Sequence, residues 1–130
     1  MVIVESENFI KQLIKLNKTY PHIYNDLNEL KKEFPSLAYK ELPPLNKSLV
    51  DVPLKRKGKI VNLIKVWRIR FGCSDINRGK AHGYRLFYCK SGDETTIFSA
   101  IFIKKEIIKE GRINLLAEEI VDTIQREGIL

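Results

Sequence analysis

The sequence predicts an α+β fold in which an antiparallel sheet carries an N-terminal helical hairpin and a C-terminal helix. Apolar residues recur every three or four positions over residues 7–34 and 113–124, which is typical of amphipathic helices. Over residues 66–103 they instead alternate with polar residues or run together, which is typical of strands. The predicted order is β-α-α-β-β-β-α, in one domain that spans residues 1–130.

The first third of the chain is expected to be a strand followed by two helices. The β-prone run Val2–Val4 suits an edge or outer strand, and Ser6 is a plausible N-cap for a helix over residues 7–19. Pro21 suits the first position of a second helix. The apolar stripe of that helix has spacings of four, three and four, and Pro35 is expected to end it.

The segment after the second helix gives weaker signals because prolines interrupt it. Ser36–Leu42 is expected to make at most one extra helical turn, and Pro44–Lys59 is expected to form a loop. A loop of this length is either functional or conceals an undetected element. Ile60–Ile64 is interpreted as a short apolar strand or as a packed segment leading into the next strand.

The rest of the chain is organised around a hairpin in its middle. The first strand, Val66–Phe71, alternates apolar and cationic residues, so Arg68 and Arg70 are expected to face away from the core. The second strand, Tyr84–Tyr88, is rich in aromatic residues and carries Arg85, which is expected on the same face. Three further basic residues are expected at the rim of this face: Arg78, Lys80 and His82.

The two cysteines of the chain offer an alternative register for this hairpin. Cys73 and Cys89 do not form a metal-binding motif. If they formed a cross-strand disulfide, paired positions would sum to an even number, and Arg68 and Arg70 would face away from Arg85. Because a cytosolic setting favours free thiols, we adopt the register that gathers the arginines.

Two elements are expected after the hairpin. Lys90–Glu94 is expected to form a tight turn, followed by an interior strand over Thr95–Ile103, which is apolar on both faces. Lys104, Lys105 and Glu106 are expected to end that strand. The final amphipathic helix is expected to end at Gly128.

Basic residues are concentrated in the centre of the chain. The formal net charge is +7, and residues 52–74 contain seven Lys or Arg residues but no Asp or Glu. This pattern favours a polyanionic partner such as RNA or DNA, with Lys65 among the expected RNA contacts, although a solvated cationic surface is the plain alternative. No apolar run approaches the ~20 residues that span a bilayer, and no basic segment precedes the apolar N-terminus. We therefore expect no signal peptide, no membrane partner and a cytoplasmic location.

Three motifs in this region resemble those of a known family. They are the alternating strand Val66–Phe71, the run Arg78–Tyr88 (RGKAHGYRLFY), and an apolar strand that ends in Lys104-Lys-Glu106. Together with the predicted order of elements, they make the segment from about Gly58 to Glu106 similar to the bacterial and archaeal RelE/HigB toxin superfamily. The resemblance implies a RelE-like fold.

The resemblance also implies a function. Most members are toxins of type II toxin–antitoxin pairs that cleave mRNA in the ribosomal A site, and a cognate antitoxin covers their basic sheet face. The expected partners are therefore the antitoxin, mRNA and the ribosome. The related ParE branch poisons DNA gyrase instead, and the fold alone does not decide between the two. A basic nucleic-acid-binding module unrelated to toxins is a third hypothesis.

The family's reaction is the attack of a ribose 2′-hydroxyl on the adjacent phosphodiester, which requires no metal or other cofactor. By resemblance, Arg85 is expected to stabilise the charge that builds on the phosphorane. Arg68 and Arg70 stand where better-known members carry lysines, and arginine is a poor base. Either these two arginines of the expected catalytic site only bind phosphate, or another residue is the base. His82 is the obvious base, although a simple turn residue beside Gly83 is an equal alternative.

The remaining candidates are expected to contact RNA. Lys80, Lys104 and Lys105 are alternative bases, and Lys105 best matches the family's basic residue after the last strand. These lysines and Arg78 are otherwise expected to bind backbone phosphates. Phe87 shares the expected face of Arg85 and could stack on a base or belong to the core. Well-studied ribosome-dependent members place a Tyr soon after the last strand, and this chain has none there.

Overall fold

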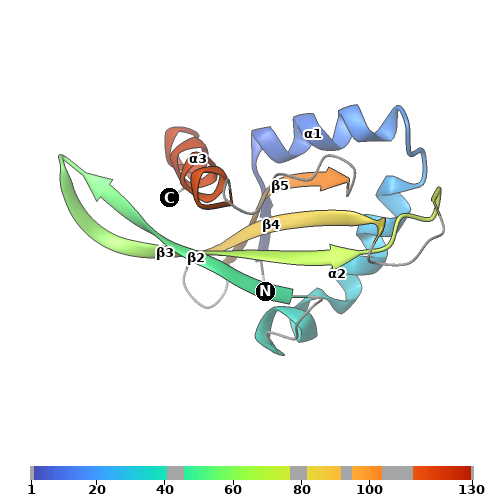
Figure 1. Ribbon diagram of the computed structural model, residues 1–130, viewed down its shortest axis with the longest axis horizontal. Helices are drawn as coiled ribbons and strands as arrows, with labels where there is room; N and C mark the ends of the chain where they lie inside the picture. The colour runs from blue at the N-terminus through green and yellow to red at the C-terminus, as the bar shows by residue number, and fades with distance from the viewer. Residues whose placement is uncertain (1, 41–45, 77–81, 92–94, 104–112, 130) are drawn as a thin grey trace.

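The computed structural model describes residues 2–40, 46–76, 82–91, 95–103 and 113–129, which form three helices and five strands (Figure 1). In chain order, the elements are β1 (Val2–Glu5), α1 (Glu7–Asn17), α2 (Ile23–Lys40), β2 (Asn46–Arg56), β3 (Lys59–Phe71), β4 (Tyr84–Ser91), β5 (Thr95–Ile103) and α3 (Ile113–Arg126). The predicted α+β class, the N-terminal helical hairpin and the C-terminal helix are confirmed.

The five strands form one mixed sheet in the order β1-β5-β4-β3-β2. β1 runs parallel to β5, and the other three pairs are antiparallel. The prediction of a purely antiparallel sheet is therefore wrong at one edge. The reason is that β1 pairs with the last strand rather than with a neighbour in sequence, after a connection that includes both helices of the hairpin. The element order is β-α-α-β-β-β-β-α, one strand more than predicted.

The additional strand is β2, which occupies most of the segment that we expected to be a loop. It pairs with β3 along its length, and β3 itself runs unbroken through residues 60–64. Pro53 does not interrupt the pairing, because β2 is an edge strand and one side of it needs no hydrogen-bond partner. The sequence does contain a signal for this strand, since Val50, Val52 and Leu54 alternate at period two.

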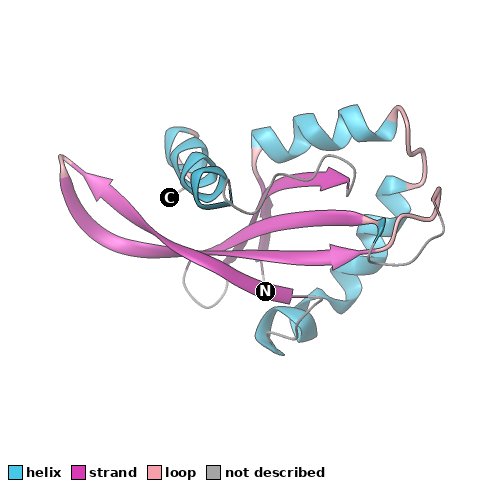
Figure 2. Cartoon of the chain, viewed as in Figure 1, coloured by secondary structure: helices cyan, strands magenta, loops and turns pink. Residues whose placement is uncertain are grey.

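Helices cover both faces of the sheet (Figure 2). α1 and α2 pack on one face, where the ring of Phe34 lies edge-on against those of Tyr88 and Phe98. α3 covers part of the other face and buries Ile120 and Ile124 there. None of the helices in the described ranges is long and apolar enough to cross a membrane.

The helix boundaries differ from the predictions mainly at the two prolines. Ser6 caps α1 as predicted, because its Oγ accepts a hydrogen bond from the Phe9 backbone N at 3.1 Å. α2 begins two residues after Pro21 and continues through Pro35, so the prediction that Pro35 ends this helix is wrong. The buried stripe that precedes Pro35 packs on the sheet, and we infer that this packing outweighs the roughly 3 kcal/mol that a proline costs inside a helix.

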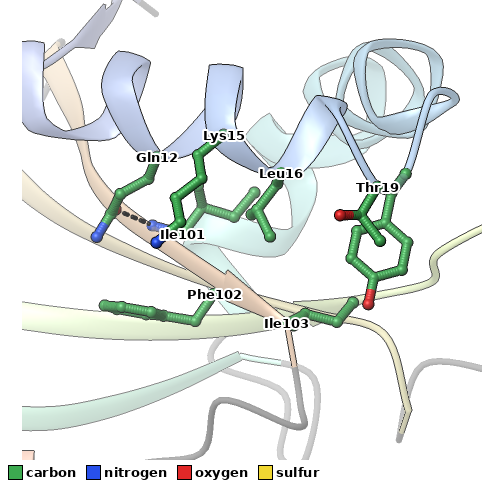
Figure 3. A pocket seen from close by; sticks show the side chains of 8 residues that line it. Gln12, Lys15, Leu16, Thr19, Ile101, Phe102 and Ile103 are labelled. Carbon is green, nitrogen blue, oxygen red and sulfur yellow. Dashed lines mark hydrogen bonds between the residues drawn. The ribbon is translucent and has the colours of Figure 1, made fainter.

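Side chains of α1 complete the edge of β5 where β1 ends. β1 pairs with β5 only as far as Phe98. Beyond it, the backbone O of Ser99 accepts hydrogen bonds from the Ser6 Oγ and the Asn8 Nδ2, and the Ile101 backbone N donates to the Gln12 Oε1 at 2.8 Å (Figure 3). These contacts fix α1 beside the end of the sheet that carries the site described below.

The loop after β3 is held to the start of α2 by two carboxylates. Asp26 accepts hydrogen bonds from the backbone N and the hydroxyl of Ser74. Asp75 accepts one from the His22 backbone N at 3.0 Å, and its Oδ1 lies 2.7 Å from the His22 Nδ1. The hydrogen bond with Asp75, followed by its charge, raises the pKa of His22 above 6.5, and the same hydrogen bond lowers the pKa of Asp75 below 3.8.

Asp75→Asn is expected to return the pKa of His22 towards 6.5. By linkage, the pair stabilises the fold fully between about pH 3.8 and 6.5. Its contribution is lost as pH falls through the lowered pKa of Asp75, and also as pH rises through the raised pKa of His22. NMR titration of the ring protons measures the effect, and His82→Gln identifies which histidine signal is which. The same His22 pKa in wild type and Asp75→Asn would contradict the pairing.

Candidate phosphate-binding site

Strand alternation places three arginines together on one face of the sheet. In the register of β3 with β4, Arg70 lies opposite Arg85 and Arg68 lies opposite Phe87. Directly opposed residues of an antiparallel pair have Cβ atoms about 4.5–5.5 Å apart. Trp67 lies on the other face, in the core under α1 and α2. The predicted gathering of these side chains, here named the arginine cluster (Arg68, Arg70 and Arg85), is confirmed.

The alternative register with a disulfide is wrong. Cys89 pairs with Val66, so paired positions sum to an odd number, 66 + 89 = 155. Cys73 belongs to the core under α1 and α2, whereas Cys89 belongs to the core under α3. Both are free, and the Cys73 Sγ donates a hydrogen bond to the Tyr84 hydroxyl at 3.1 Å.

Arg85 is the most deeply buried member of the arginine cluster. Only 6% of its surface is exposed, while Arg68 and Arg70 are half-buried. Its Nη1 donates hydrogen bonds to the backbone O of Tyr84 at 3.2 Å and of Gly83 at 3.4 Å. These bonds turn one side of the guanidinium back onto the start of β4, which fixes its orientation.

The Nε atoms of Arg68 and Arg70 are buried, and each makes no hydrogen bond to the part of the chain that the structure describes. Within the same ranges, neither side chain forms an ion pair with a carboxylate. A buried donor without a partner costs roughly 1–3 kcal/mol, and more when the group is charged. Among the described residues, these two cationic donors therefore have no acceptor, and an anion bound from outside would supply one.

Burial and the repulsion of neighbouring cations both oppose the charges of Arg85 and Arg68. Burial, followed by the charges of Arg70 and Arg68, lowers the pKa of Arg85 to about 10. Burial and then the charge of Arg70 lower the pKa of Arg68. Arg85 still carries its charge at pH 7, since its pKa lies well above that value. Planar guanidinium groups in this arrangement are suited to bind phosphate bidentately.

The aromatic residues beside the arginine cluster differ from the expectation. Phe87 is 6% exposed and packs in the core that α3 covers, so of its two predicted roles the structure supports the core one. Its ring lies edge-on to Phe102, with ring centroids 5.8 Å apart. Phe102 is opposite Arg85 in the register of β4 with β5, and it is only partly buried. We did not predict Phe102, because Thr95–Ile103 carries apolar residues on both faces, so its sequence does not show which face is exposed.

A small groove lies beside Phe102 at the edge of β5 (Figure 3). Its volume is about 260 Å³, and α1, the residues that follow it and the end of β5 enclose it. Lys15 is charged, and the other described residues of its lining are not. The lining residues are Gln12, Lys15, Leu16, Thr19, Tyr20, Ile101, Phe102 and Ile103.

The other predicted site residues are distributed unevenly. His82 lies in a short turn immediately before β4, partly exposed and three residues before Arg85. The RNA contact expected of Lys65 stays a prediction. Lys65 lies on the face of the sheet opposite the arginine cluster, with its Nζ 5.5 Å from the centre of the Trp67 ring. Successive side chains of a strand point to opposite faces of the sheet, so Lys65 lies on the same face as Trp67 and not on that of Arg68. Four predicted contacts lie outside the described residues: Arg78, Lys80, Lys104 and Lys105.

Within the described ranges, no three His, Cys, Asp or Glu side chains are grouped in a way that could hold a metal ion. Comparisons of the chain with protein-family models, curated proteins and solved structures give no match. A functional conclusion for this chain therefore depends on the motifs and on the geometry of the arginine cluster.

Proposed function

We propose that the protein is a RelE/HigB-like toxin of a type II toxin–antitoxin pair that cleaves mRNA on the ribosome. The observation that carries this proposal is the arginine cluster, in which three neighbouring guanidinium groups include two buried Nε donors without hydrogen bonds to the described chain. A scissile phosphodiester supplies acceptor oxygens for the Nε atoms of Arg68 and Arg70, which have no hydrogen-bond partner among the described residues. The motifs around these arginines add the resemblance to the toxin superfamily.

In the proposed reaction, the ribose 2′-oxygen attacks phosphorus and the bond to the 5′-oxygen breaks. The products are a 2′,3′-cyclic phosphate and a 5′-hydroxyl. Arg85 is assigned to the charge that develops on the phosphorane, and Arg68 and Arg70 to the phosphate oxygens. His82 is assigned to take the proton of the 2′-hydroxyl. The proton for the leaving 5′-oxygen is assigned, by the resemblance alone, to one of three lysines: Lys80, Lys104 or Lys105.

Phe102 is the aromatic side chain that the arginine face offers to an RNA base. It lies opposite Arg85 and is partly exposed, whereas Phe87 is enclosed in the core. Stacking of a base on an aromatic ring contributes about 1–3 kcal/mol. Phe102 thus takes the role proposed for the aromatic residue that the C-terminal segment lacks.

The partners that follow from the proposal are translated mRNA, the ribosome and a cognate antitoxin. The antitoxin would neutralise the protein by covering the arginine face, as the resemblance implies. Both the substrate and the partner place the activity in the cytoplasm.

The proposal is tested by mapping the 5′ ends of a message in a cell-free translation reaction that contains the purified protein. The same message without ribosomes is the control. We expect new ends only where the message is being translated. Intact message together with undisturbed translation would contradict the nuclease function.

A toxin of the same fold that is not a nuclease, such as a ParE-like gyrase inhibitor, is the second candidate. It is favoured by the apolar surroundings of the arginine cluster, where Phe87 and Phe102 are the described neighbours on β4 and β5. An acid–base residue has no role in such a protein. His82→Ala should therefore lower the activity of a nuclease strongly and leave gyrase inhibition, measured by DNA supercoiling, unchanged.

A further inference from the structure

The paired ends of β2 and β3 project from the body of the protein as a twisted two-stranded arm (Figure 1). We define the basic arm as residues 55–63. At the base of the arm, Leu54 and Ile64 are buried in the core that α3 covers. The backbone O of Lys55 accepts a hydrogen bond from the Gln125 Nε2 at 2.9 Å. Every residue of the arm is exposed. The fold therefore anchors the base of this ribbon and leaves its tip in solvent.

The tip of the basic arm is a two-residue turn formed by Lys57 and Gly58. Arg56 pairs with Lys59 across it, and both turn residues have positive φ, 52° for Lys57 and 76° for Gly58. Such turns favour Asn or Asp at the first position, because a longer side chain in the left-handed region is strained. Lys57 therefore occupies a turn position whose backbone conformation favours Asn or Asp.

The positive charge of the basic arm is concentrated at its tip. Four of the five residues from Lys55 to Lys59 are cationic, and no Asp or Glu lies between Val52 and Ser74. None of these four side chains forms an ion pair within the described part of the chain. All four side chains are exposed, and none of them stabilises the described part of the chain through an ion pair.

We propose that the basic arm binds the phosphate backbone of a double-helical nucleic acid, as a contact separate from the arginine cluster. Two strands about 4.7–4.9 Å apart form a ribbon narrow enough to enter the major groove of B-form DNA, which is about 12 Å wide. The four cations at its tip would then face the phosphates that line the groove. This contact does not depend on the chemistry proposed for Arg85.

The exposed apolar residues of the basic arm fit the same partner. Ile60, Val61 and Leu63 are 61%, 53% and 56% exposed. Apolar side chains on a ribbon can contact sugars and base edges in a groove while the neighbouring cations bind phosphate. An acidic protein that lies along the arm is the competing partner, and the test below distinguishes it.

The length of the arm sets the size of the probe. Lys59 and Arg70 are 11 positions apart in β3 (70 − 59), which is at most about 36 Å along the strand. About ten base pairs of duplex at 3.4 Å each cover that distance. A duplex of about 20 base pairs is therefore long enough to touch both the arm and the arginine cluster.

The experiment measures binding of the full chain to labelled 20-base-pair RNA and DNA duplexes by fluorescence anisotropy over a range of salt concentrations. The arm variant combines Lys55→Gln, Arg56→Gln, Lys57→Asn and Lys59→Gln, with Asn chosen because it suits the left-handed turn position. The control removes three exposed cations from the helical layer, away from the groove beside Phe102: Lys11→Gln, Lys18→Gln and Lys32→Gln. Circular dichroism confirms that both variants are folded.

We expect the arm variant to bind at least about 10-fold more weakly and to lower the salt slope by roughly 2–4, because each phosphate contact contributes nearly one unit. The control should change binding by less than about 3-fold. Tighter binding of the RNA or of the DNA duplex shows which of the two nucleic acids the arm contacts. Equal losses in both variants, or no binding of either duplex by the wild type, would overturn the proposal and favour a protein partner.

The two proposals fail separately. Arg85→Ala should abolish cleavage while retaining arm-dependent binding, because Arg85 is not part of the arm. Duplex binding that needs the arm, without any cleavage on ribosomes, would remove the nuclease function and leave the arm contact in place. Cleavage on ribosomes, with no effect of the arm variant on duplex binding, would remove the arm contact and leave the nuclease function in place.

Discussion

Arg85→Ala is expected to lower the rate of message cleavage by about 10²–10³, the usual cost of losing one preorganised donor to a transition-state charge. Arg85 is the buried centre of the arginine cluster, and bonds to the backbone O of Gly83 and Tyr84 fix its guanidinium. The group is therefore oriented before substrate binds. Single-turnover cleavage of a translated message measures the effect.

A loss of folding cannot explain this result if stability is measured in parallel. Because burial and two neighbouring cations lower the pKa of Arg85, folding disfavours its charge. We therefore expect Arg85→Met, which keeps the length of the side chain, to unfold at a denaturant concentration equal to or above that of the wild type while it is as inactive as Arg85→Ala. Retained cleavage by Arg85→Met would remove Arg85 from the reaction.

Gly83→Ala is expected to destabilise the protein by at least about 3 kcal/mol, at the upper end of the usual cost of overpacking. A Cβ at Gly83 would lie 2.1 Å from the backbone O of Phe71 and 2.9 Å from the Cα of Gly72. Both contacts are with backbone atoms, which cannot move away by a change of rotamer as a side chain can. β3 and β4 would have to separate at the point where Arg70 faces Arg85.

Gly72→Ala is the matched control for this variant. The two glycines lie on facing segments, but a Cβ at Gly72 would meet nothing within 4 Å. We expect a change in unfolding free energy below about 1 kcal/mol, measured by urea denaturation. Comparable losses in the two variants would show that the close approach of the backbones at Gly83 does not limit stability.

The arginine cluster could be predicted from sequence because alternation sets the facing of each strand by itself. Arg68 and Arg70 are separated from one another by an apolar residue, and Arg85 follows an aromatic residue that belongs in the core. Only the relation between the two strands was ambiguous. In the observed register, Arg70 pairs with Arg85, so all three arginines lie on one face of the sheet. The same register places Cys73 and Cys89 on opposite faces.

The basic arm could not be predicted in the same way. Pro53 and the Pro43-Pro44 pair favour a loop when each is considered alone, and only the position of β2 at the sheet edge makes Pro53 compatible with a strand. The pairing of β1 with β5 is likewise a contact between distant segments, which no local pattern encodes. Phe102 was missed because its strand is apolar on both faces, so its partial exposure depends on what covers the sheet.

The central claim is that the arginine cluster promotes attack by a ribose 2′-hydroxyl on a phosphodiester. The measurement that tests it most directly is the chemistry of the ends in a message cut by the purified protein during translation. The account predicts a 2′,3′-cyclic phosphate on one fragment, a 5′-hydroxyl on the other, and no cut where the attacking nucleotide is replaced by its 2′-deoxy form. Fragments with a 5′-phosphate and a 3′-hydroxyl, or cleavage at the 2′-deoxy position, would contradict it.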